Sequence, residues 1–291
     1  MIKTTTVGLI GLGAMGGRIA QNLIEAGYTI VIHNRSAEKA RPLLDRGATF
    51  ATTPRLAAEQ SDVIISMVTD DAASRQVWLA AETGAIWGVS SGKIAIAMST
   101  LTVDWVRELY GAIAECDADF LEVPVIGSRP QAEAGKLMAL VGGEKETLMR
   151  VEPILTAAGI ASIQHIGTVG QGMAMKLAVN ALFGTQVAVL AELLAMLSRH
   201  DISLAKAMSC LENLPVLSPA AKGAGGLMVS ENYAPLFPIH LVEKDLGYVA
   251  QVGQNLGGTM PISVAVGEVY RSAIARGHGD DNITGIVQLF L

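Results

Sequence analysis

Apolar and polar positions alternate in two different ways along the chain. As far as residue 167, short β-rich apolar runs alternate with helical stretches, which is the pattern of a parallel sheet covered by helices. The predicted strands are Val7–Ile10, Thr29–Ile32, Ala48–Phe50, Val63–Val68, Lys93–Ala97, Ala118–Glu122, Leu137–Val141 and Ser162–Ile166. The predicted helices among them are Ala14–Ala26, Ala37–Arg46, Val103–Glu115 and Lys145–Ala158.

The pattern changes after Gly167. Residues 170–200 have a long helical pattern, and further helical segments follow it without a convincing strand. The glycine cluster at residues 223–226 predicts a loop between helices. Polar residues interrupt the apolar stretch Ala178–Leu197, which therefore predicts a buried helix and not a membrane span. We expect an α/β domain over residues 1–167 and an all-α domain over residues 168–291.

The composition is that of a soluble globular protein. Of the 291 residues, 51% are hydrophobic and 16% are charged, which excludes a disordered chain. The net charge of −6, without any Lys/Arg run, excludes a nucleic-acid or anionic-membrane surface. Cys116 and Cys210 are far apart, so we expect neither a disulfide framework nor a metal site. Residues 1–6 precede a glycine-broken run that does not resemble a secretion signal, and we expect a cytoplasmic protein.

A glycine-rich motif follows the first predicted strand directly. Gly11-Leu12-Gly13-Ala14-Met15-Gly16 has the GxGxxG spacing between a strand and a helix, which is the context of a dinucleotide-binding turn. Gly11 permits the tight turn, Gly13 lets the backbone approach a pyrophosphate, and Gly16 allows close helix–strand packing. The helix N-terminus, with Ala14 and Met15, offers N–H groups to the anion. We expect a Rossmann-type domain with these residues at the cofactor.

The second strand ends at the position that selects between NAD and NADP. An acidic residue about 20 residues after the glycine loop binds the ribose 2′-OH of NAD. Here the chain has Asn34, Arg35 and Ser36, and an arginine beside a hydroxyl can pair with the 2′-phosphate. The three residues therefore predict NADP(H) in preference to NAD(H). In the alternative interpretation, Arg35 is an ordinary solvated loop arginine.

Four segments together resemble the β-hydroxyacid dehydrogenase family, which includes 3-hydroxyisobutyrate dehydrogenases and glyoxylate/succinic semialdehyde reductases. They are the glycine motif with Asn22-Leu23, Glu122-Val123-Pro124-Val125-Ile126-Gly127-Ser128 with Gly135 and Leu137, Gly170-Gln171-Gly172-Met173-Ala174-Met175-Lys176 with Asn180, and Lys244-Asp245-Leu246. The resemblance covers essentially the whole chain. It implies a long interdomain helix between the two domains and a homodimer or homotetramer.

The resemblance implies that Lys176 is the catalytic acid/base. Independently of it, Lys176 and Asn180 lie four apart, on one face of a helix, where both can reach one substrate. An ammonium group can stabilise the negative charge that hydride transfer leaves on a carbonyl oxygen, and can donate the proton. Alternatively, Lys176 covers apolar surface and Asn180 is a satisfied buried amide.

The second segment departs from the family pattern at Ile126. Family members typically have a serine there, whose hydroxyl helps to hold the substrate carboxylate. The backbone N–H groups of Gly127 and Ser128, with Ser128 or Arg129 as a substitute donor, would have to bind the anionic end of the substrate. In the alternative, the substrate is less polar than a small hydroxy acid.

Further cofactor contacts follow from the resemblance. Met67, Val68 and Thr69 are expected near the adenine and phosphates, and Thr100 near the nicotinamide ribose. Lys244 is expected to reach the cofactor and the substrate, whereas its alternative is an exposed lysine paired with Glu243 or Asp245.

These expectations combine into one activity, the NADPH-dependent reduction of a small aldehyde or 2-oxo acid such as glyoxylate or succinic semialdehyde. The nicotinamide would supply the hydride and Lys176 the proton. One alternative is an imine reductase-like NADPH enzyme that acts on a less polar substrate. Another is a module that binds NADP without turnover.

Overall fold

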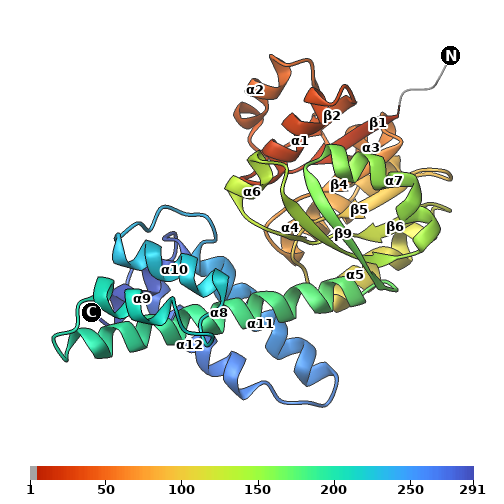
Figure 1. Ribbon diagram of the computed structural model, residues 1–291. Helices are drawn as coiled ribbons and strands as arrows, with labels where there is room; N and C mark the ends of the chain where they lie inside the picture. Colours follow the sequence, from red (N-terminus) through yellow and green to blue (C-terminus); the bar gives the residue numbers. More distant parts are fainter. Residues whose placement is uncertain (1–4) are drawn as a thin grey trace. The chain divides into compact units, whose positions relative to one another are not determined.

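The computed structural model describes residues 5–291 (Figure 1). Residues 1–4, part of the segment in which no secretion signal is expected, lie outside the described residues. The chain divides into two compact units, Met1–Lys176 and Leu177–Leu291. The domain boundary expected after residue 167 lies at the end of the last strand and stays a prediction.

The N-terminal unit contains a nine-stranded sheet in the order β3-β2-β1-β4-β5-β6-β8-β7, with β9 paired to β8. The pairings among β1 to β6 are parallel, and their order 3-2-1-4-5-6 is that of the dinucleotide-binding fold. The fold class is therefore confirmed. The strands are β1 Thr6–Ile10, β2 Thr29–His33, β3 Thr49–Phe50, β4 Val63–Ser66, β5 Ile94–Ala97, β6 Asp119–Glu122, β7 Val125–Ile126, β8 Leu137–Gly143 and β9 Ile160–Gly167.

The central strands are short and apolar because helices cover both faces of a parallel sheet. Every residue of β4 and β5 is buried. Side chains begin several of the covering helices, since Thr53, Asp70 and Thr102 each accept the backbone N–H three residues later. The helical elements are α1 Gly16–Glu25, η1 Ala37–Ala40, α2 Arg41–Leu44, α3 Pro54–Glu59, α4 Asp71–Leu79, η2 Ala85–Gly88, α5 Val103–Ala114, α6 Arg129–Glu133 and α7 Lys145–Ala157.

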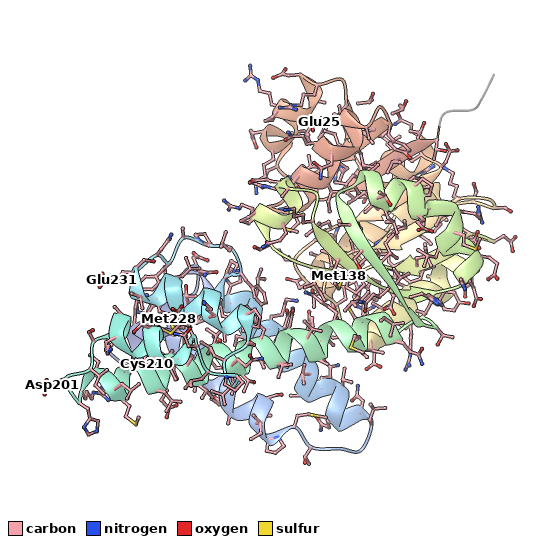
Figure 2. All side chains as sticks on the ribbon, in the orientation of Figure 1. Glu25, Met138, Asp201, Cys210, Met228 and Glu231 are labelled. Carbon is pink, nitrogen blue, oxygen red and sulfur yellow. The ribbon has the colours of Figure 1, made fainter. Side chains whose placement is uncertain are left out.

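The C-terminal unit is helical, and no strand occurs between residues 168 and 291. Its core gathers apolar side chains such as Leu194 and Met228, the latter labelled in Figure 2. The buried hydroxyl of Tyr270 donates to the carbonyl of Gly184 at 2.8 Å. The helical elements are α8 Gln171–Ser198, which begins in the N-terminal unit, α9 Leu204–Leu211, α10 Pro219–Val229, α11 Ile239–Asn255, α12 Pro261–Ala275 and η3 Ile283–Leu289.

The expected loop at residues 223–226 is wrong, because these glycines lie inside α10. Ser218 caps this helix by accepting the N–H of Ala221, and the helix packs Ala224 and Met228 into the core. Packing and capping thus override the low helix propensity of glycine.

Helix α8 is long and apolar enough to cross a membrane by length and composition, a test that core helices of soluble proteins also pass. The expected burial holds for one face only. Val187, Ala191 and Leu194 are buried, whereas Leu182 and Val189 are 64% and 48% exposed.

Candidate functional site

The glycine loop between β1 and α1 is shaped by backbone contacts that exclude side chains. Gly11 has φ +101°, and a Cβ on it would lie 2.2 Å from the carbonyl oxygen of Met67. A Cβ on Gly16 would lie 2.0 Å from the carbonyl oxygen of Gly11, so α1 starts directly against the loop. Gly13 faces open space instead. The loop is therefore closed on its inner side and open where the backbone could approach a phosphate.

A cavity of about 470 Å³ borders the open side of this loop. Arg18 donates to the carbonyl of Ala14 and pairs with Glu133 at 2.6 Å, while Met15 directly precedes α1. An open glycine face, a helix start and a neighbouring cavity fit the diphosphate of a dinucleotide cofactor. The cavity is lined by Leu12, Gly13, Gly17, Arg18, Gln21, Lys39, Pro42, Leu43 and Glu133.

The three residues after β2 have different environments. Asn34 connects the glycine loop to the loop after β2. Its Oδ1 accepts the N–H of Leu12 at 2.8 Å, and its Nδ2 donates to the carbonyl of Ser36 at 2.9 Å. Arg35 is exposed, and it has no ion-pair partner among the residues that the structure describes. Lys39, which the sequence analysis missed, is also exposed and lines the cavity beside Gly13. Its place one helical turn after the Arg35-Ser36 pair is the signal that could have found it.

The loops after β4 and β5, where the resemblance places cofactor contacts, are tied together. Val68 donates its N–H to Ser99 Oγ at 2.7 Å. Asp71 accepts both the N–H and the hydroxyl of Thr102, at 2.9 Å and 2.5 Å.

Met67 and Thr69 lie in the first loop and Thr100 in the second. Because parallel strands end at one edge of the sheet, these loops and the glycine loop share that edge.

The expected anion-binding residues lie at the turn from β7 to α6. Ile126 ends β7, and Gly127 has φ +119° with a Cβ position 2.8 Å from a methyl carbon of Leu137. Ser128 donates its N–H and its hydroxyl to Gln131 Oε1, both at 2.9 Å. Arg129 Nε is buried without a hydrogen-bond partner among the described residues. Both donors of Ser128 are therefore used within the protein. The Nε–H of Arg129 has no acceptor among the described residues.

Lys176 and Asn180 lie one turn apart on α8, and both are 8% exposed. Asn180 Nδ2 donates to Asp245 Oδ2 at 2.6 Å. Asp245 Oδ1 lies 2.7 Å from Lys244 Nζ, which stands 4.4 Å from the ring centre of Tyr248. The pairing with Asp245 matches one part of the alternative interpretation of Lys244, but the lysine is half-buried and not exposed. Asp245 is the residue that sequence reasoning passed over, although it stands inside the Lys244-Asp245-Leu246 motif.

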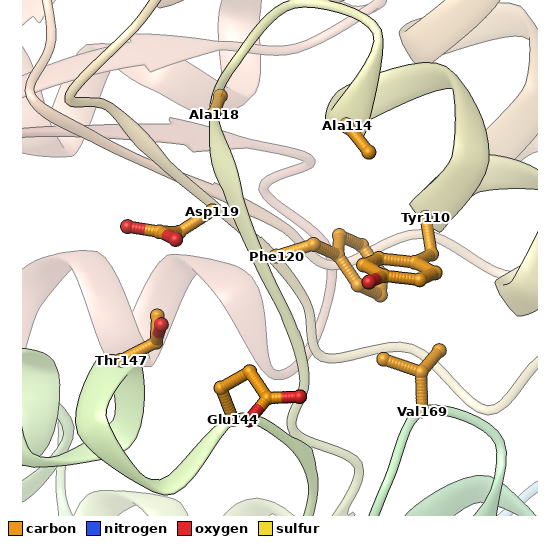
Figure 3. Close-up of a pocket in the computed structure, with 8 residues that line it drawn as sticks. All are labelled: Tyr110, Ala114, Ala118, Asp119, Phe120, Glu144, Thr147 and Val169. Carbon is orange, nitrogen blue, oxygen red and sulfur yellow. The ribbon is translucent and has the colours of Figure 1, made fainter.

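Other features of the described residues lie outside this constellation. No group of three metal-ligating side chains occurs among residues 5–291, and Cys116 and Cys210 are both free thiols. A cavity of about 160 Å³ lies between α5, the start of β6 and the start of α7 (Figure 3). Asp119 opens β6, so this cavity lies toward the edge of the sheet opposite the glycine loop.

Family comparisons agree with the glycine loop and the strand order. Residues 6–181 match the NAD binding domain of 6-phosphogluconate dehydrogenase, and residues 170–290 match the NAD-binding domain of NADP-dependent 3-hydroxyisobutyrate dehydrogenase. The chain belongs to the β-hydroxyacid dehydrogenase family. Glyoxylate/succinic semialdehyde reductase 2, chloroplastic, of Arabidopsis thaliana is 30% identical over 287 residues, 99% of this chain and 80% of that protein.

Solved structures are similar to this chain over 98% of its length. The 3-hydroxyisobutyrate dehydrogenase of Salmonella typhimurium gives a TM-score of 0.87 at 25% identity, covering 98% of this chain and 100% of that chain. An imine reductase from Pseudomonas sp. gives 0.66 at 22% identity, covering 98% and 99%, and shows the fold alone. This member of the β-hydroxyacid dehydrogenase family is an NAD(P)-dependent oxidoreductase of the hydroxyacid dehydrogenase type.

Proposed function

We propose that this protein is an NADPH-dependent reductase of a small aldehyde or 2-oxo acid, with glyoxylate and succinic semialdehyde as leading substrates. The observation that carries the proposal is the pair formed by Lys176 and Asn180, buried and one turn apart on α8. The names of relatives such as the Arabidopsis reductase support the substrate class.

The chain's own residues supply orientation and a proton. When bound at the glycine loop, the nicotinamide cofactor supplies the hydride. Lys176 Nζ donates the proton to the oxygen that becomes a hydroxyl, and its positive charge stabilises the oxyanion as it forms. Asn180 orients the substrate, and its hydrogen bond to Asp245 fixes the rotamer of its amide. Lys244, held by the same carboxylate, acts at the cofactor or the substrate carboxylate.

The anionic end of the substrate is proposed to bind at the turn after β7. Ile126 offers no side-chain donor, and both donors of Ser128 are directed to Gln131. The N–H of Gly127 and the guanidinium of Arg129 are then the groups that replace the missing hydroxyl. An arginine is well suited to this role because it binds carboxylates through paired hydrogen bonds.

NADPH is the proposed cofactor because exposed Lys39 lines the cavity beside Gly13, and exposed Arg35 directly follows Asn34, which accepts the N–H of Leu12 in the glycine loop. We expect Arg35→Asp to weaken NADPH binding roughly 10- to 100-fold, because a charge-assisted hydrogen bond contributes about 1.5–3 kcal/mol. NADH binding should change much less. Fluorescence titration with each nucleotide measures both constants, and equal losses for the two nucleotides would contradict the placement of Arg35.

The decisive experiment follows nicotinamide absorbance for wild type and Lys176→Ala with glyoxylate, succinic semialdehyde, tartronate semialdehyde and a cyclic imine. We expect NADPH oxidation with a small aldehyde acid, reduced about 10²- to 10⁴-fold by Lys176→Ala. The matched control is Lys145→Ala, which removes an exposed lysine at the start of α7. Full activity in Lys176→Ala would refute the proposed proton donor.

The imine reductase alternative has support in Ile126 and in the fold shared with the Pseudomonas enzyme. Turnover of the cyclic imine without turnover of any aldehyde acid would favour it. Tight NADPH binding without turnover of any substrate would favour a non-catalytic module.

We also propose a cytoplasmic homo-oligomer that uses the exposed face of α8. Leu182, Val189 and Met196 recur on that face every two helical turns and are 64%, 48% and 46% exposed. A stripe of this kind is costly to leave in water. Light scattering should show a dimer or tetramer for the wild type, and Leu182→Glu with Val189→Glu should shift it towards monomer. A wild-type monomer would refute the assembly, and cell fractionation tests the location.

A further inference from the structure

The carboxyl group of Glu122 has no assigned role, yet it is one of the most deeply buried charged groups in the N-terminal unit. Its side chain ends β6 with no exposed surface. Oε1 accepts the backbone N–H of Gly170 at 2.7 Å and of Gly172 at 2.9 Å. Oε2 is buried without a hydrogen-bond partner among the described residues. One carboxylate oxygen therefore binds the backbone at the start of α8.

Three glycines lie where Glu122 meets the start of α8, and one of them makes room for the carboxylate itself. A Cβ on Gly142, the partner of Glu122 across the sheet, would lie 2.0 Å from Oε1. A Cβ on Gly172 would lie 2.7 Å from the carbonyl oxygen of Leu140, so α8 begins directly on strand β8. Gly170 has φ +97°, and a Cβ on it would lie 2.9 Å from Arg107 Nε. Gly142 thus leaves room for the carboxylate, whereas Gly172 lets α8 approach β8 and Gly170 lets the chain approach α5.

The backbone contacts of Glu122 come one helical turn before Lys176. The first N–H groups of a helix have no partner within it, and a carboxylate that accepts them also complements the helix dipole. The same turn is held from a second side, because Leu101 donates its N–H to Met173 Sδ at 3.3 Å. Leu101 directly follows Thr100, in the loop where a cofactor contact is expected. The turn that precedes Lys176 is therefore tied to the end of β6 and to this loop.

We propose that Glu122 is a positioning residue for Lys176, whose carboxylate fixes the first turn of α8 against the sheet. This inference rests on the proton-donor role proposed above for Lys176. A lysine that must meet one oxygen needs a fixed backbone, since a misplacement of about 1 Å can cost roughly 100-fold in rate. Hydrogen bonds to backbone N–H groups hold the helix backbone itself in place, which a pair of flexible side chains would not do.

The chemistry of the group supports a role beyond filling space. Burial raises the pKa of Glu122 to about 7, against the N–H groups of Gly170, Met173 and Gly172 and the guanidinium of Arg107, which lower it. A charged anchor is costly there, whereas an apolar side chain would not be. Other titratable groups nearby are Arg107 on α5, Lys176 itself, and His165 on β9, whose Nε2 lies 2.7 Å from the carbonyl oxygen of Gly143.

The test compares Glu122→Leu, which removes the acceptor at similar volume, with Glu122→Gln, which keeps one acceptor oxygen. Each variant is assayed with NADPH and glyoxylate or succinic semialdehyde. Hydrogen exchange of the peptide that covers residues 168–177 is measured on the same protein. We expect Glu122→Leu to lower kcat roughly 10- to 100-fold with little change in the NADPH dissociation constant. Exchange in the peptide should become faster, and Glu122→Gln should restore most of both properties.

The control variant is Asp119→Asn on the same strand, which disrupts only an exposed ion pair with Arg150. It should keep wild-type kcat and exchange. If Glu122→Leu does not fold, Gly142→Ala, which displaces the carboxylate from the N–H groups of Gly170 and Gly172, is measured with the same two readouts.

The outcomes separate the two proposals. Wild-type kcat and exchange in a folded Glu122→Leu, with Lys176→Ala inactive, would overturn the positioning role and leave the proton donor intact. Wild-type kcat and exchange in Gly142→Ala would also overturn it. Full activity in Lys176→Ala would instead refute the proposed function, while faster exchange in Glu122→Leu would still show that the anchor exists.

Discussion

Two buried carboxylates contact α8, and they are held in opposite ways. Glu122 of the N-terminal unit is fully buried and accepts backbone N–H groups. Asp245 of the C-terminal unit is 2% exposed, and it accepts the amide of Asn180 and faces the ammonium of Lys244 at 2.7 Å. Both contacts flank Lys176 in the sequence, since they fall at residues 170–172 and at residue 180. The hydrogen bonds to Glu122 come from backbone N–H groups, which carry partial charges, whereas Asp245 lies against the full charge of Lys244.

The two carboxylates are expected to affect the stability of the protein differently. A buried ion pair gains Coulomb energy, and removing one partner leaves the other charge uncompensated. Backbone N–H groups carry only partial charges, and burial therefore dominates the pKa of Glu122. We infer that Asp245 is costly to remove, whereas Glu122 is costly to keep in its ionised form.

The largest expected effect is on the side of Asp245. Replacing it by Leu removes the carboxylate that faces Lys244 and accepts the amide of Asn180, and should lower the free energy of unfolding by about 3–5 kcal/mol. Urea unfolding followed by circular dichroism measures this loss. The control is Glu243→Gln, which loosens an exposed pair with Arg271 and should cost at most about 1 kcal/mol. Equal losses in both variants would contradict the distinction between the two carboxylates.

A pH-dependent effect is expected on the side of Glu122. Its folded-state pKa of about 7 lies above the ordinary value of 4.5, so the folded state holds an extra proton between these two pH values. The stability contributed by this group is complete below about pH 4.5 and is lost as the pH rises through 7. The loss amounts to about 3 kcal/mol, since one pKa unit corresponds to about 1.4 kcal/mol.

Glu122→Gln has no such proton. Its free energy of unfolding minus that of the wild type should therefore rise by about 3 kcal/mol between pH 4.5 and 7.5. Urea unfolding followed by tryptophan fluorescence suits this test, because Trp78, Trp87 and Trp105 all lie in the N-terminal unit. A difference that does not change with pH would show that burial does not raise the pKa of this carboxyl.

Much of the fold follows from local sequence. The eight predicted strands all exist, with ends shifted by a few residues. The apolar runs of central strands such as β4 and β5 match a sheet that is covered on both faces. Strand β7 was missed because Pro124 and Gly127, on either side of its two residues, are typical of a turn. The prediction of a loop at residues 223–226 was wrong. Tertiary packing stabilises a helix there in spite of the low helix propensity of glycine. Local patterns therefore predicted elements well where burial is symmetric and poorly where packing alone decides.

The candidate site was predictable only where the signal is local. The motif predicted the turn between β1 and α1, where Gly16 packs against Gly11 and Gly11 against Met67, and its role at the cofactor stays a prediction. Asp245 and Glu122 act through partners 65 and 48 residues away. No spacing rule connects such residues, and only the folded sheet and helices bring them together. Lys39 was missed for a different reason, since a single surface lysine has no distinctive pattern.

The smallest expected effect tests the space reserved for Glu122. Gly142→Ala places a methyl group where Oε1 now lies, so the carboxylate must move away from the N–H groups of Gly170 and Gly172. Overpacking of this kind costs about 1–3 kcal/mol. We expect that loss in urea unfolding at low pH, together with a weaker pH dependence, because a displaced carboxyl is less buried.

A matched control is Gly223→Ala in α10, where a Cβ meets nothing within 4 Å. Alanine there should stabilise the helix by about 0.5–1 kcal/mol, since glycine loses more backbone entropy on folding. The two substitutions add the same methyl group and should change stability in opposite directions. If Gly142→Ala were as stable as the wild type with the same pH dependence, the carboxylate could not be held against Gly142. Glu122 would then not be the backbone-bound carboxylate that the comparison with Asp245 requires.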